Sequence, residues 1–126
     1  MATLLSAFNN QLQEFIEELI KVFPEDNDFK TFETSLYMLK KANPRKILEL
    51  FKTYIIPYSD KILKKDENFF LEENYEHLYN QNNTNAEKGW IITNKLKKYW
   101  NEISNNTKDI IWEYFKVLIL LSNKCN

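Results

Sequence analysis

The side chains best able to do chemistry gather around His77, the only histidine of this chain. Glu72, Glu73 and Glu76 come just before it. An imidazole and carboxylates are common ligands of divalent metals, but their spacing matches no metal-binding signature. We therefore interpret the group as surface residues and predict no metal site.

No other stretch resembles an active site. The only cysteine is Cys125, where we expect a frayed tail, and the sequence contains no Gly-x-Ser-x-Gly motif. A nucleophile, a base and an orienting group are therefore not brought together. A chain with one glycine also cannot form a glycine-rich phosphate loop. The sequence predicts a non-enzymatic protein without catalytic or cofactor-binding residues.

Basic and aromatic residues alternate along a helix predicted over residues 86–101. Lysine can contact phosphate and an aromatic ring can stack on a base, so this face is a candidate nucleic-acid surface. Its lysines are Lys88, Lys95, Lys97 and Lys98, and a second basic cluster comprises Lys40, Lys41, Arg45 and Lys46. The formal net charge is −1, which favours the alternative of a solvated helix face.

The same helix carries bulky anchors that suit a protein partner. Nine Phe, seven Tyr and three Trp are many for one small core, and exposed aromatic residues are typical of contact sites. The candidate partner-binding residues are Trp90, Tyr99, Trp100, Tyr75 and Tyr79. In the alternative these rings complete the core. A contact site predicts that Trp90→Ala or Trp100→Ala weakens a complex and leaves the fold intact.

A helix predicted over residues 109–122 organises the rest of the chain. Between Ile110 and Leu121 only Glu113 and Lys116 are charged, and with Asp109 they form one narrow polar stripe. A helix that is apolar around most of its circumference belongs in an interior. The run is too short for a membrane span, which needs roughly 18 apolar residues.

Further helices are predicted over residues 3–22, 28–42, 44–55, 58–65 and 86–101. Apolar residues at steps of three and four mark the first, and Pro24 ends it. Asn43 and Pro44 signal the start of the third, as N-cap and first helical residue, and residues 104–107 are expected to form a loop. The sequence predicts one all-α domain, residues 1–126, a compact bundle of five or six helices around a buried C-terminal helix.

The order of several short pieces resembles a family of small uncharacterised helical proteins encoded by giant (nucleocytoplasmic large) DNA viruses. The pieces are Phe8 through Phe23-Pro24, Asn43-Pro44, Pro57-Tyr58 with Lys61-Ile62, Phe69-Phe70-Leu71, Lys95-Leu96-Lys97-Lys98-Tyr99-Trp100, and Ile111-Trp112-Glu113-Tyr114-Phe115-Lys116-Val117-Leu118. The resemblance implies a viral protein that acts in an infected cell or in the virion. It implies no active site.

These observations together predict a viral protein–protein interaction or assembly module, which includes self-association and a role as a virion component. The alternative is an accessory nucleic-acid-binding protein that uses the Lys88–Lys98 face. The first residues lack the basic and apolar regions of a signal peptide. We therefore expect an intracellular protein, in the host cytoplasm or the virion, that is not secreted and does not bind a membrane.

Overall fold

The computed structural model describes residues 3–67 and 95–125, and in these residues it is all-α. The helices are α1 (Leu4–Val22), α2 (Asn27–Ala42), α3 (Lys46–Tyr54), the 3₁₀ turn η1 (Ile56–Tyr58), α4 (Ser59–Leu63) and α8 (Asn105–Lys124). Residues 95–99 form a further helical turn. The predicted all-α helical bundle is confirmed.

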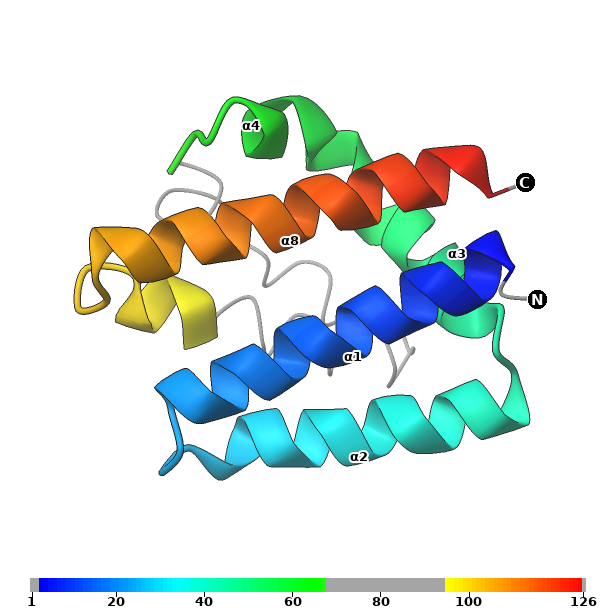
Figure 1. Ribbon diagram of the computed structural model, residues 1–126, viewed down its shortest axis with the longest axis horizontal. Helices are drawn as coiled ribbons and strands as arrows, with labels where there is room; N and C mark the ends of the chain where they lie inside the picture. The colour runs from blue at the N-terminus through cyan, green and yellow to red at the C-terminus, as the bar shows by residue number, and fades with distance from the viewer. Residues whose placement is uncertain (1–2, 68–94, 126) are drawn as a thin grey trace.

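The longest helices lie side by side in the order α8, α1, α2, and each runs antiparallel to its neighbour (Figure 1). Helix α3 contacts all three of them near one end of this layer, and α4 packs against α8. Helix α1 therefore lies between α8 and α2, so it shares the central place that the sequence predicted for the C-terminal helix alone.

Side-chain caps set the starts of the long helices. The Thr3 hydroxyl accepts from the Ser6 amide at 3.0 Å, and the Asp26 carboxylate accepts from the Asp28 amide at 3.0 Å. Each cap satisfies an amide at the start of a helix that has no partner within the helix. Thr3 is therefore the N-cap of α1, and Pro24 lies in the turn that follows this helix.

Two predicted boundaries were wrong. Helix α3 begins at Lys46, because the Asn43 side chain accepts from the Arg45 amide and closes a turn before the helix. Helix α8 begins at Asn105, so the predicted loop over residues 104–107 is largely helical. Its N-cap is Ser104, whose hydroxyl accepts from the Thr107 amide at 3.1 Å.

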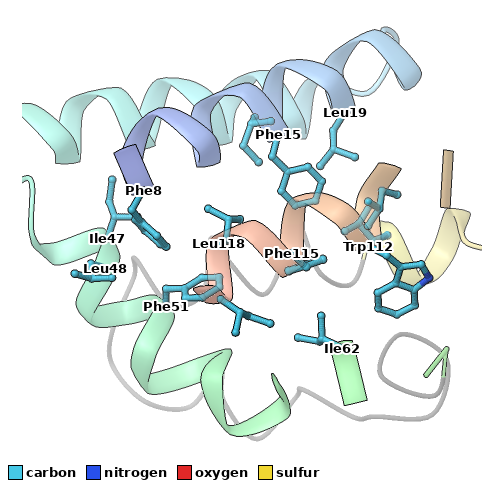
Figure 2. Close-up of a cluster of buried hydrophobic side chains, with 14 of the residues drawn as sticks. Phe8, Phe15, Leu19, Ile47, Leu48, Phe51, Ile62, Trp112, Phe115 and Leu118 are labelled. Atoms are coloured by element: carbon cyan, nitrogen blue, oxygen red, sulfur yellow. The ribbon is translucent and has the colours of Figure 1, made fainter. Parts of the chain in front are cut away.

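One continuous apolar core joins the helices (Figure 2). Phe15 on α1 packs edge-to-face against Phe115 on α8, and Phe8 meets Phe51 on α3 in the same way. Helix α8 buries only one side, which includes Ile111, Trp112, Phe115, Leu118 and Ile119. Ile110 is 39% exposed and Leu120 is 48% exposed, so part of the apolar surface of α8 faces solvent.

Candidate functional site

Several residues proposed for partner or nucleic-acid binding lie outside the described residues. These are Tyr75, Tyr79, Lys88 and Trp90, together with His77, Glu72, Glu73 and Glu76. The structure does describe Lys95, Lys97, Lys98, Tyr99 and Trp100. The surroundings of these five residues decide which of them are open to a partner.

Trp100 is a core residue. Its side chain is 0% exposed, and its ring packs edge-to-face on Trp112 of α8 with centroids 5.3 Å apart. The Lys108 ammonium lies 5.3 Å from the ring centroid. The interpretation of Trp100 as an exposed partner-binding residue is wrong, because the turn after residues 95–99 places the indole beneath α8.

Lys95 and Tyr99 connect the helical turn of residues 95–99 to the α1–α2 turn through polar contacts. The Tyr99 hydroxyl donates to Asp26 Oδ2 at 2.7 Å. The Lys95 ammonium lies 3.3 Å from Asp26 Oδ2 and 3.1 Å from Asp28 Oδ2. We call these four residues the Asp26 cluster, and they connect parts of the chain that are distant in sequence.

The pKa values follow the contacts of the Asp26 cluster. The hydrogen bond from Tyr99 lowers the pKa of Asp26, helped by the Asp28 amide and Lys95, although burial opposes this shift. The carboxylates of Asp28 and Asp26 raise the pKa of Lys95. The hydrogen bond to Asp26, and then burial, raise the pKa of Tyr99. Each shift favours the form that makes the contact.

An aromatic stack packs against the Asp26 cluster through the Tyr99 ring. The Phe23 ring stacks on Tyr99 at 4.4 Å and on Phe29 at 5.3 Å between centroids. Tyr99 thus uses its ring for packing and its hydroxyl for Asp26. Neither Tyr99 nor Lys95 presents an open binding group, although both were predicted to contact a partner or nucleic acid.

Three other basic residues proposed for nucleic-acid binding lie at separate places on the protein. Lys98 is exposed, and its ammonium lies 5.6 Å from the Tyr99 ring centroid. Lys41 holds its ammonium 4.6 Å from the Tyr37 ring centroid, whereas Lys40 lines a groove between α1 and α2. The lysines that the sequence grouped as a nucleic-acid surface are therefore partly used within the protein.

Cys125 is buried, so the prediction of a frayed tail was wrong. Its amide caps the end of α8, and its carbonyl accepts a hydrogen bond from the Lys52 ammonium. Among residues 3–67 and 95–125 no group of three or more His, Cys, Asp or Glu side chains is arranged to hold a metal ion. In the same residues no helix is long and apolar enough to cross a membrane.

The groove between α1 and α2 has a volume of about 240 Å³ and a mixed lining. Leu12, Leu36 and Ile47 contribute apolar surface, while charged residues of both signs include Glu17 and Lys40. Asn9 borders it and donates its amide to the Pro44 carbonyl at 3.0 Å. That hydrogen bond joins α1 to the turn before α3, so Asn9 has a structural role.

A second, shallow groove lies between α1 and α8 and has a volume of about 390 Å³. Ile110, Tyr114 and Val117 of α8 form its apolar floor. The remaining lining residues are Gln11, Glu14, Asp109 and Glu113. We call this site the α1/α8 groove and its three carboxylates the acidic rim.

The floor of the α1/α8 groove is fixed by the core beneath it. The Tyr114 ring stacks on Phe15 with centroids 5.2 Å apart and an interplanar angle of 10°. Burial, followed by the nearby carboxylates of Glu18 and Glu14, raises the pKa of the Tyr114 hydroxyl. The Tyr114 ring is therefore packed on the core and lies near several carboxylates.

The carboxylates of the acidic rim lack cationic partners within the part of the chain that the structure describes. Glu14, Asp109 and Glu113 form no ion pair with any residue in the described ranges. Glu14 accepts only a hydrogen bond from Gln11, at 3.4 Å. An open apolar floor beside unpaired negative charge can accommodate a ligand that combines apolar and cationic groups.

Sequence reasoning missed the α1/α8 groove because it placed every apolar residue of the C-terminal helix in the interior. The sequence did contain one signal for the groove: α1 and α8 each carry a stripe of polar, mostly acidic residues. Gln11, Glu14 and Glu18 share a face of α1, and Asp109 and Glu113 share a face of α8. Two acidic stripes on helices that pack together indicate an edge of their interface that faces water.

Comparison with known proteins finds no matching family model, no matching curated sequence and no matching solved structure. A function for this chain is therefore inferred from the geometry of the α1/α8 groove.

Proposed function

We propose that this chain is a non-enzymatic protein–protein interaction module that binds its partner in the α1/α8 groove. The family resemblance of the sequence supports a further part of the proposal, that the module acts for a giant DNA virus in an infected cell or virion. The observation that carries the binding role is the open apolar floor of Ile110, Tyr114 and Val117 beside the acidic rim.

The clustering of the floor residues distinguishes the groove from ordinary exposed apolar surface. A single exposed side chain such as Leu120, at 48%, needs no functional explanation. In the α1/α8 groove, three apolar residues adjoin one another on the face shared by two helices. Apolar surface bordered by polar groups is typical of an interaction site.

The chemistry of the groove favours a basic amphipathic helix as its ligand. Apolar side chains of such a helix, spaced three and four residues apart, would cover the floor. Its lysines or arginines would lie beside Glu14, Asp109 and Glu113. The same three carboxylates would repel the phosphates of a nucleic acid, so this site favours a protein partner.

A synthetic helical peptide of leucine and lysine tests the binding role. We expect its titration to shift the amide NMR signals of residues 110–117, and to do so less at high salt because the rim contributes charge. Glu14→Lys combined with Glu113→Lys should abolish the shifts. Glu25→Lys combined with Glu49→Lys adds the same charge at exposed positions outside the groove and should not change them.

Binding of the peptide elsewhere, or equal loss in both double variants, would refute the proposed site. A single-stranded oligonucleotide in a parallel titration tests the alternative function. Salt-dependent oligonucleotide binding that persists in the groove variant, without peptide binding, would favour nucleic acid as the ligand.

A further inference from the structure

Helix α2 carries a second exposed apolar surface, one edge of which borders the groove between α1 and α2, where Thr34 and Tyr37 contribute to the lining. Tyr37 is 54% exposed and Met38 is 65% exposed, more than the other large apolar side chains in the described residues. Lys30, Thr34 and Lys41 are exposed on the same side of the helix, at steps of three and four from this pair. We call Lys30, Thr34, Tyr37, Met38 and Lys41 the α2 stripe.

The α2 stripe has the chemistry that the α1/α8 groove lacks. It has an apolar centre between two lysines, whereas the groove has an apolar floor beside three carboxylates. Lys30 and Lys41 form no ion pair with a described residue, and the Lys41 ammonium lies over the Tyr37 ring at 4.6 Å. Both surfaces therefore keep their charges available for a partner.

The α2 stripe and the α1/α8 groove are also similar in length. Lys30 and Lys41 are about 16 Å apart along the helix axis, and the groove residues Asp109 to Val117 extend for about 12 Å along α8, at about 1.5 Å per residue. The stripe is thus slightly longer than the groove, so a helix carrying it can extend along the floor with one lysine near each end of the groove.

From this complementarity we infer that the α2 stripe of one copy of the chain docks in the α1/α8 groove of a second copy. This inference rests on the proposed function, because it uses the same groove and names its occupant. Helices α2 and α8 lie on opposite sides of α1 (Figure 1). The contact joins two different surfaces, so it is a heterologous interface, which forms rings or chains rather than requiring a two-fold dimer.

The association should be weak and dependent on concentration. A single helix against a shallow groove buries less than the roughly 1,200–2,000 Å² of a stable protein–protein interface. Assembly at such a contact becomes substantial where many copies are held close together, since several weak contacts then act jointly. This property suits an assembly module.

Sedimentation velocity across a concentration series tests the inference on the full chain. The groove variant combines Glu14→Lys with Glu113→Lys, and the stripe variant combines Lys30→Glu with Lys41→Glu. Each should weaken self-association at least about tenfold, because like charges then face one another. The control Lys64→Glu with Lys65→Glu matches the charge change of the stripe variant at exposed positions outside both surfaces.

Mixing the groove variant with the stripe variant is the decisive experiment. Every contact between the two variants pairs opposite charges again, so the mixture should recover the association that neither variant shows alone. A wild-type chain that stays monomeric throughout the series would overturn the inference. So would self-association that both variants retain, or a mixture that fails to recover it.

The peptide titration separates this inference from the proposed function. A monomeric chain whose groove still binds the leucine–lysine peptide would overturn only the choice of a second copy as occupant. A groove that binds neither the peptide nor a second copy would overturn both proposals.

Discussion

The Asp26 cluster and the α1/α8 groove contrast in how they use charged and aromatic side chains. In the Asp26 cluster, the Lys95 ammonium and the Tyr99 hydroxyl are held by carboxylates within the protein. In the groove, Tyr114 forms an open floor and Glu113 has no ion-pair partner among the described residues. The comparison shows that residue type alone does not identify a binding surface, because charged and hydroxyl groups can already be paired with other groups of the same protein.

The same contrast explains why the residues that looked most suited to binding hold the fold together. Lys95, Tyr99 and Trp100 lie within one short segment of mixed basic and aromatic character. In the structure they contact two separate elements: Lys95 and Tyr99 contact the α1–α2 turn, and Trp100 contacts helix α8. Substitutions in this segment should therefore change stability first.

The largest expected effect is that of Trp100→Ala. Removing a fully buried indole that packs on Trp112 should lower the free energy of unfolding by about 3–5 kcal/mol, as for other large core deletions. Phe115→Ala, in the same core, should cost a similar amount. Urea denaturation followed by circular dichroism measures both. A near-neutral Trp100→Ala would restore this residue as a surface anchor.

A second prediction compares two adjacent isoleucines of α8. Ile111 is 1% exposed and Ile110 is 39% exposed. Ile111→Ala should cost about 2–5 kcal/mol because it leaves a cavity in the core. Ile110→Ala, at the groove floor, should change stability by less than about 0.5 kcal/mol. The same urea titrations test this difference, and equal costs would mean that Ile110 is not open to solvent.

Local patterns in the sequence were sufficient to predict α1 and α2. Apolar side chains at steps of three and four define one buried face on α1, and Pro24 fixes where it ends. The start of α8 was missed because Asn105, Asn106 and Thr107 look like a polar loop. Their helical state depends on the Ser104 cap and on the packing of the rest of α8.

The candidate site could not be predicted in the same way, because its residues come from helices that are distant in the sequence. Helix α8 is apolar around most of its circumference, so its packing against α1, α3 and α4 decides that Ile111 is buried and Ile110 is open. The pairing of Asp26 with Lys95 likewise leaves no local signal. Both features arise from tertiary packing, which one sequence without its fold does not specify.

A third prediction concerns Asp26, which serves both as the N-cap of α2 and as the acceptor for Tyr99 and Lys95. Asp26→Ala removes both roles and should cost about 1–2 kcal/mol. Asp26→Asn keeps a good N-cap and removes only the charge, so it should cost less than the alanine variant. Urea titrations at pH 7 give this comparison.

The pH dependence of unfolding then tests the charge of Asp26. Because its pKa in the folded protein is below the ordinary value of 3.8, Asp26 stabilises the fold above that value, and this contribution is lost as pH falls through the folded pKa. The raised pKa values of Lys95 and Tyr99 produce the opposite dependence of stability at alkaline pH. Their contribution to stability is present below about pH 10 and is lost as pH rises further. Asp26→Asn should flatten the acid dependence and weaken the alkaline one, because Tyr99 loses the Asp26 contact that raises its pKa, while Asp28 still raises the pKa of Lys95. An acid limb as steep as that of the wild type would show that other carboxylates, and not Asp26, produce it.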